Sequence, residues 1–313
     1  MPAVLAIVGP TASGKTAVSL RVAERLGGEV VSMDSRQVYR GMDIGTAKVL
    51  PQEAGAIPHH GLNLVDPHER YSAGAFARDA RRWIREIGGR GRVPVLVGGT
   101  GFFLRALTHP MFREPPMDPA RRERLKSWLA GQPADLLHGW LRHLDPPTAA
   151  ALEGGGGAQR ISRALEVALL TGRPLSWWHA HAPSEEEPLS PRIFVLELPR
   201  EELCARIDRR VDAMVEAGLV DEVRRLVEEG YDERATAMSA TGYPEMLAFL
   251  RGEVSLAATV EAIKRATRSY ARRQQTWFRH QLPPDAVRLD ASRPSAALAD
   301  EIVRTWLQEE GGT

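Results

Sequence analysis

The sequence predicts an α/β protein with a parallel sheet in its core domain and an inserted, mostly helical second domain. In the first hundred residues, short apolar runs alternate with helical patterns, and strands that alternate with helices form parallel sheets. From about residue 113 to 188, strand patterns vanish and arginine-rich helical patterns replace them. A strand pattern then returns at Arg192–Leu198. We therefore expect a core domain from residues 1–112 and 189–313, and a helical domain at 113–188.

Apolar periodicity locates the main elements. The expected core strands are Ala3–Val8, Glu29–Ser32, Leu62–Val65, Val93–Val97, Arg192–Leu198 and Val287–Leu289. Between the first two strands, Val18, Val22 and Leu26 recur every four residues and Gly27 follows them. This pattern predicts a helix that begins near Gly14 and ends at Gly27. Helices in the insertion are expected at Pro119–Leu129 and Gln159–Leu170.

The composition limits the class of protein. With 313 residues, 43% of them hydrophobic, the chain can bury one large core or two modest ones, which excludes a disordered or coiled-coil protein. Forty-one basic and forty acidic residues leave a net charge of +1. Any surface for nucleic acid must therefore be a local patch.

The sequence predicts neither export nor membrane insertion. Cys204 is the single cysteine, which rules out an internal disulfide and favours a reducing compartment. The apolar run Ala3–Val8 is too short for a signal peptide, and no window approaches the roughly 18 apolar residues of a membrane span. We expect a cytoplasmic protein that does not cross a membrane.

Residues 9–16 match the pattern G-x-x-x-x-G-K-[ST], after an expected strand and at the start of an expected helix. In such a P-loop, backbone N–H groups surround a phosphate, the lysine adds a cation and the hydroxyl holds Mg²⁺. The same pattern is typical of ATP-binding proteins; a glycine-rich turn without function is the alternative. The sequence predicts a P-loop core that binds a phosphate or diphosphate through Gly9, Pro10, Thr11, Ala12, Ser13, Gly14, Lys15 and Thr16.

Asp34 follows the second expected strand, at the sheet edge where open α/β folds bind ligands. Its carboxylate is interpreted as an indirect Mg²⁺ ligand, as a general base facing an acceptor across the phosphate, or as a helix N-cap. Gln37 offers the donor and acceptor pair that an adenine edge accepts, so we interpret it as a base-recognition residue. The strand at Val93–Val97 ends in Gly98-Gly99-Thr100-Gly101, which by itself is compatible with a simple turn.

Six segments together resemble the bacterial tRNA dimethylallyltransferases, also called tRNA isopentenyltransferases. They are GPTASGKT at 9–16, DSRQVYRGMDIGTAK at 34–48, YSAGAFARDA at 71–80, VLVGGTGF at 95–102, QRISRALEV at 159–167 and RRQQTWFRH at 272–280. The resemblance covers nearly the whole chain. It implies transfer of a dimethylallyl group from dimethylallyl diphosphate to the exocyclic amine of the adenosine immediately 3′ of the tRNA anticodon, giving isopentenyladenosine.

The resemblance also implies roles at the donor end of the site. The loop at 9–16 would hold the diphosphate of the prenyl donor rather than ATP, with Lys15 among the catalytic residues and Mg²⁺ at Thr16. Arg210 matches an arginine that contacts the diphosphate, although a solvated helix face is the alternative for it. A diphosphate leaving group needs this charge neutralisation.

The remaining matches concern the acceptor. Asp34 resembles the general base on the adenine amine, and Thr100 the threonine beside the acceptor base. The implied tRNA contacts also include Ser35, Arg36, Gln37, Arg122 (or its neighbour Arg121), Gln159, Arg160, Ile161, Ser162 and Arg163. No acidic residue occurs between Glu261 and Asp285, where basic and aromatic side chains predict an RNA surface or a solvated helix face: Lys264, Arg265, Arg268, Tyr270, Arg272, Arg273, Trp277, Phe278 and Arg279.

The implied partners are the tRNA anticodon stem-loop and dimethylallyl diphosphate, with Mg²⁺ as cofactor and no obligate protein partner. A monomer is the expectation from the resemblance. Two chemical alternatives share the loop: a P-loop kinase and an adenylate isopentenyltransferase. A third is an RNA-binding protein that uses nucleotide hydrolysis only as a switch.

Overall fold

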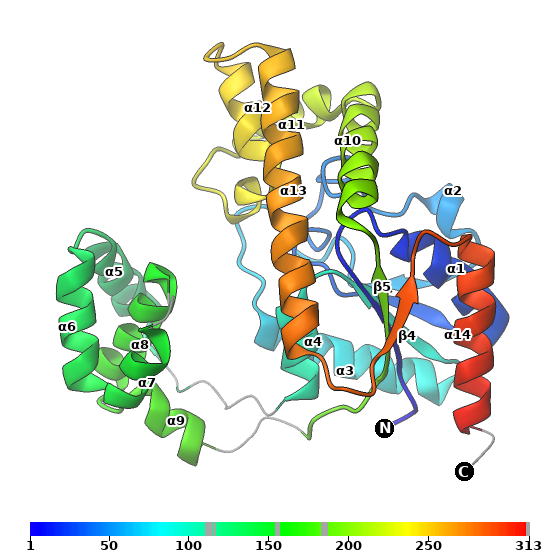
Figure 1. Ribbon diagram of the computed structural model, residues 1–313. Coiled ribbons are helices and arrows are strands. Elements are labelled where there is room, and N and C mark those ends of the chain that lie inside the picture. Colours follow the sequence, from blue (N-terminus) through cyan, green and yellow to red (C-terminus); the bar gives the residue numbers. More distant parts are fainter. Residues whose placement is uncertain (110–114, 116, 154–156, 183–186, 311–313) are drawn as a thin grey trace. The chain divides into compact units, whose positions relative to one another are not determined.

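A computed structural model describes residues 1–109, 115, 117–153, 157–182 and 187–310. The chain divides into two compact units, Met1–Thr108 with Leu189–Thr313, and His109–Pro188 (Figure 1). The boundary expected between residues 112 and 113 lies outside the described residues. No helix in the described ranges combines the length and the apolar character that a bilayer crossing needs.

The first unit is built on one six-stranded parallel sheet, so the predicted α/β class is confirmed. Its order is β3-β2-β4-β1-β5-β6. The strands are β1 (Leu5–Val8), β2 (Glu29–Ser32), β3 (His59–His60), β4 (Pro94–Gly98), β5 (Arg192–Glu197) and β6 (Val287–Asp290). Leu5 pairs with Val95 on one side and with Arg192 on the other, so the chain returns to the same sheet after the helical unit.

One strand prediction was wrong. The apolar run at Leu62–Val65 does not form the third strand, which lies earlier, at His59–His60. Gly61 and Asn63 both have positive φ, +84° and +53°, so the backbone turns where an extended strand would need negative φ. Val65 keeps only an isolated bridge to Tyr39.

Helices cover the sheet and end in the ways expected of them. They are α1 (Lys15–Leu26), α2 (Pro51–Ala54), α3 (Ala73–Gly89), α4 (Gly101–Thr108), α10 (Arg200–Glu216), α11 (Leu219–Glu228), η1 (Thr236–Ser239), α12 (Tyr243–Leu250), α13 (Leu256–Gln281) and α14 (Ser295–Glu310). The prediction for α1 is confirmed: Val18 and Val22 are buried. Gly27 caps the helix with φ +60°. Helix α14 packs beside α1 (Figure 1).

Helices α10 and α13 form a pair that stands over the carboxyl ends of the strands (Figure 1). Two ion pairs set their antiparallel register: Lys264 lies 2.8 Å from Asp212, and Arg268 lies 2.5 Å from Asp208. Both cations thus have acidic partners on the other helix, and Lys264 also lies 3.4 Å from Glu261 on its own helix. The hydrophobic core joins both halves of the chain, from Leu5 on β1 to Phe194 on β5.

The second unit contains helices and no strand among its described residues. The helices are α5 (Pro119–Ala130), α6 (Ala134–Leu144), α7 (Pro146–Leu152), α8 (Ala158–Thr171) and α9 (Leu175–His181). Its own small core includes Leu129, Leu141, Ile161 and Leu165. The helices predicted at Pro119–Leu129 and Gln159–Leu170 are confirmed as α5 and α8.

Candidate active site

The P-loop runs from β1 into α1 and lies against the last residues of β5. A Cβ atom on Gly9 would lie 2.7 Å from the Leu196 carbonyl oxygen, so only glycine permits this approach. The Ser13 hydroxyl is buried and has no hydrogen-bond partner among the residues that the structure describes. Helix α1 begins at Lys15, after Gly14 with φ +87°, and its N-terminus favours a bound anion.

Lys15 is the cation of this loop. Its Nζ donates to the carbonyl oxygens of Gly9 at 3.0 Å and Pro10 at 2.6 Å. Burial and, to a lesser extent, the nearby Arg210 lower the pKa of Lys15 to about 7 against the opposing effect of Asp34. Burial disfavours the protonated form of an amine. The negative charge of a bound phosphate would stabilise the protonated form of Lys15.

Asp34 lies directly after β2, in a turn that it stabilises itself. Its Oδ1 accepts N–H groups from Arg36 at 2.8 Å and Gln37 at 3.4 Å. In the described part of the chain, Oδ2 has no hydrogen bond. One oxygen therefore holds the turn, and the other remains for chemistry.

Thr100 follows β4, the neighbour of β2, and therefore lies beside Asp34. Its Oγ1 accepts the N–H of Ser35 at 3.1 Å. A Cβ atom on Gly98 would lie 2.1 Å from the Met33 carbonyl oxygen, so the glycine turn lets the two strand ends meet closely. This turn thus has a structural function in addition to presenting Thr100.

Helix α13 closes this side of the site. The phenol of Tyr270 is hydrogen bonded with Thr100, and burial, followed by the charge of Asp34, raises the pKa of Tyr270 to about 12. Gln274 accepts the N–H of Thr11 at 2.9 Å and donates to the Gly99 carbonyl at 2.9 Å. Gln274 therefore ties the P-loop to the glycine turn.

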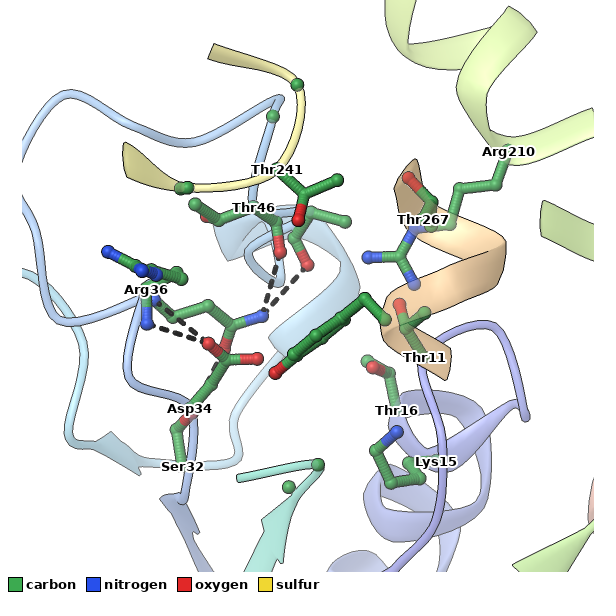
Figure 2. A pocket seen from close by; sticks show the side chains of 18 of the residues that line it. Thr11, Lys15, Thr16, Ser32, Asp34, Arg36, Thr46, Arg210, Thr241 and Thr267 are labelled. Carbon is green, nitrogen blue, oxygen red and sulfur yellow. Dashed lines mark hydrogen bonds between the residues drawn. The ribbon is translucent and has the colours of Figure 1, made fainter. Parts of the chain in front are cut away.

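These elements enclose one pocket of about 320 Å³ (Figure 2). Figure 2 shows Lys15 and Thr16 at one wall, Asp34 at another and Arg210 reaching in from α10. The pocket therefore brings together Lys15, Thr16, Asp34 and Arg210, as the sequence predicted, although Arg210 is far from the others in the chain. Burial lowers the pKa of Arg210, and Asp34 opposes this shift.

Four residues of α13 line the pocket although the sequence did not place them there: Ile263, Thr267, Tyr270 and Gln274. Of these, Tyr270 was expected only on an RNA surface. Their spacing of four, three and four residues places them on one face of a helix. That spacing was visible in the sequence, but nothing in it identified which face meets the P-loop.

The interpretation of Gln37 as a reader of adenine needs correction. Both N–H groups of its amide are used, toward the carbonyl oxygens of Thr46 and Ala47 at 3.2 Å each. Its Oε1 accepts the Ser32 hydroxyl at 2.9 Å. The amide thus holds the loop at residues 46–47, and its donors are not available to a base.

The residues predicted in the helical unit have different environments. Arg122 and Arg163 both pair with the buried carboxylate of Glu166, Arg122 at 2.7 Å. Arg160 and Gln159 are exposed and Ser162 is half-buried. Ile161 is 2% exposed and its side chain packs in the core of this unit, so that side chain is not at the surface, and the tRNA contact of this segment stays a prediction.

The basic stretch on α13 is partly neutralised. Lys264 and Arg268 pair with α10, whereas the other four cations, Arg265, Arg272, Arg273 and Arg279, are exposed. Fewer than the six expected cations are therefore unpaired on this surface, because acids on α10 form ion pairs with two of them.

A P-loop and a carboxylate in one pocket, with the Thr100 hydroxyl hydrogen bonded to the residue after that carboxylate, suit an enzyme that transfers a group from a phosphorylated donor. Residues 37–281 match the profile of the IPP transferases, and residues 2–57 that of the isopentenyl transferases. The chain belongs to the IPP transferase family of prenyltransferases.

Relatives and solved structures agree with this family. A tRNA dimethylallyltransferase of Carboxydothermus hydrogenoformans is 42% identical over 87% of this chain and 88% of its own length. That of Geobacillus kaustophilus is 43% identical over 96% of this chain and 95% of its own. The tRNA isopentenylpyrophosphate transferase of Bacillus halodurans superposes with a TM-score of 0.72 at 37% identity, covering 100% of this chain and 99% of that one. A eukaryotic dimethylallyltransferase acting on tRNA gives 0.79 at 30% identity, over 93% and 74%.

Proposed function

We propose that this chain transfers the dimethylallyl group of dimethylallyl diphosphate to the exocyclic amine of the adenosine immediately 3′ of the anticodon in tRNA. The observation that carries the proposal is that Lys15, Arg210 and the carboxylate of Asp34 line the same pocket, with the two cations facing the carboxylate. Two cations suit a diphosphate, and a carboxylate suits an amine that must lose its proton.

The donor's diphosphate lies in the P-loop, with Lys15 and Arg210 as its cations. The loop also fits Mg²⁺, because the exposed Thr16 hydroxyl and the unpartnered Ser13 hydroxyl offer oxygen ligands beside the phosphate site. When bound, Mg²⁺ would neutralise charge that develops on the leaving diphosphate.

In the transfer step, the amine nitrogen bonds to C1 of the dimethylallyl group as the bond from C1 to the diphosphate oxygen breaks. The bonding electrons leave with the diphosphate, and Oδ2 of Asp34 takes the amine proton. Tyr270 stays protonated and orients Thr100 beside the acceptor. Because the lone pair of an adenine amine is delocalised into the ring, proton removal as the bond forms increases its reactivity.

The tRNA contacts fall to the exposed cations Arg160, Arg265 and Arg272, and to Arg36 at the pocket. The target adenosine must leave its stack to reach Asp34, which costs a few kcal/mol that phosphate contacts offset. With this reaction we propose a cytoplasmic protein.

Incubation with dimethylallyl diphosphate, Mg²⁺ and unmodified tRNA tests the proposal, with mass spectrometry of the digested tRNA. We expect one isopentenyladenosine per tRNA, with Asp34→Asn as the inactive control. Prenylation of free adenosine monophosphate in preference to tRNA would favour an adenylate isopentenyltransferase. RNA-stimulated ATP hydrolysis without prenyl transfer would favour a nucleotide switch.

A further inference from the structure

A buried carboxylate outside the pocket holds one of the loops that line it. Glu222 on α11 is 6% exposed. Its Oε2 accepts the N–H groups of Asp43 and Ile44 at 2.7 Å each, and its Oε1 accepts the N–H of Gly45 at 3.0 Å. Hydrogen bonds to a charged acceptor are stronger than those between neutral groups, so this one side chain anchors three consecutive amides.

Tyr243 on α12 completes this anchor. Its phenol donates to Glu222 Oε1 at 2.7 Å. A Cβ atom on Gly45 would lie 2.6 Å from the same phenol oxygen. The ring therefore rests directly on the loop backbone, which leaves the loop no room to shift toward α12.

A buried cation holds the other end of the same loop. Lys48 is 7% exposed, and its Nζ donates to Asp43 Oδ1 at 2.7 Å and to Asn63 Oδ1 at 2.6 Å. The loop at residues 43–48 is thus bound through charged groups at both ends.

The anchored loop in turn reaches the catalytic turn. The carbonyl oxygens of Thr46 and Ala47 bind the amide of Gln37, and the N–H of Gln37 binds Oδ1 of Asp34. Hydrogen bonds, joined by the backbone between Gly45 and Thr46 and by Gln37 itself, therefore connect Glu222 to Asp34. Neither Glu222 nor Tyr243 lines the pocket, so neither touches a substrate there.

We propose that Glu222, with Tyr243, is a positioning residue that orients the Asp34 carboxylate by holding the loop at 43–47 where its carbonyl oxygens accept the amide of Gln37. This inference rests on the proposed role of Asp34 as the base. A general base that hydrogen bonds hold in the productive orientation reacts faster than a mobile one, and a small displacement of a reacting group lowers the reaction rate strongly.

The main test is Glu222→Gln, which keeps the shape of the side chain but turns one oxygen into a donor that faces N–H groups. We expect kcat for prenyl transfer to fall about 10- to 100-fold while KM for dimethylallyl diphosphate changes by about twofold or less. Tyr243→Phe removes one of the four bonds and should lower kcat less. Glu228→Gln, at an exposed glutamate of the same helix, is the matched control and should leave kcat unchanged.

Two further measurements separate positioning from a loss of folding. If Glu222 and Gln37 act along one path, the kcat of the double variant Glu222→Gln with Gln37→Ala should be no lower than that of the single variant with the lower kcat. Amide hydrogen exchange should rise in Glu222→Gln at residues 36 and 37 as well as at 43–47. Multiplying effects on kcat, or faster exchange confined to 43–47, would overturn the inference.

The wild-type reaction is measured in the same series. Absence of isopentenyladenosine in the wild type would refute the proposed function. Equal kcat in wild type and Glu222→Gln would instead refute the role of Glu222 and leave the proposed function intact.

Discussion

Replacing Asp34 tests both uses of its carboxylate, because its two oxygens do different work. Oδ1 accepts two backbone N–H groups and Oδ2 faces the pocket without a hydrogen bond in the described chain. Asp34→Asn keeps an acceptor for the turn but cannot take a proton. Asp34→Ala loses both.

The expected magnitudes follow from this division. Loss of a general base lowers the transfer rate by about 10²-fold to 10⁴-fold, and this should hold for both variants. Loss of the turn's acceptor costs about 1 to 2 kcal/mol, and this should appear in Asp34→Ala alone. In a chain of this size that is a decrease in Tm of a few degrees.

Single-turnover prenyl transfer and thermal unfolding measure the two effects separately, and titration of the donor measures its binding. Donor affinity should survive in both variants, because the P-loop holds the diphosphate. The reasoning is refuted if Asp34→Asn transfers prenyl groups at the wild-type rate. It is also refuted if either variant loses diphosphate binding while its single-turnover rate is unchanged, since Asp34 would then serve the metal.

Four other predictions concern charge and packing. Arg160→Gln should weaken tRNA binding and lower the salt dependence of the affinity by about one phosphate contact. Arg163→Gln should change the affinity less, because Arg163 is paired with Glu166. An unchanged salt slope for Arg160→Gln would show that Arg160 is a solvated surface residue. Because the pKa of Lys15 is lowered, diphosphate binding above about pH 7 should take up a proton, and the binding affinity should fall as the pH rises. Calorimetry in two buffers measures this proton uptake. Lys15→Arg should abolish the pH dependence. The same shift means that the unfolded chain binds more protons between about pH 7 and 10.5, so stability without ligand should rise with pH there, and Lys15→Met should raise Tm at neutral pH. Gly98→Ala should destabilise the protein by about 3 kcal/mol or more, since the new methyl meets a backbone oxygen; wild-type Tm would contradict this.

Much of the donor site was predictable because its chemistry is local. Eight consecutive residues, from Gly9 to Thr16, form the phosphate loop, and the preceding strand and following helix are short-range features. The burial of Val18 and Val22 on α1 follows from their spacing alone. Asp34 was predictable for a related reason, since parallel strands present their carboxyl ends at one edge of a sheet.

The third strand and Gln37 show where such reasoning stops. An apolar run at Leu62–Val65 has a strand's composition, but positive φ at Gly61 and Asn63 breaks it, and contacts with β2 decide that conformation. A glutamine at the site looks like a base reader until its partners, the carbonyl oxygens of residues 46 and 47, are known.

By itself, the sequence determined the fold class, the phosphate loop, the carboxylate beside it and the family to which the chain belongs. Only the tertiary structure decided which face of α13 closes the pocket, that Gln274 ties the loop to the Gly99 turn, and that Glu222 anchors the loop at 43–45. These contacts join residues more than 150 positions apart. Spacing along one helix identifies the residues that share a face, but the partner of that face is set by how the whole chain packs.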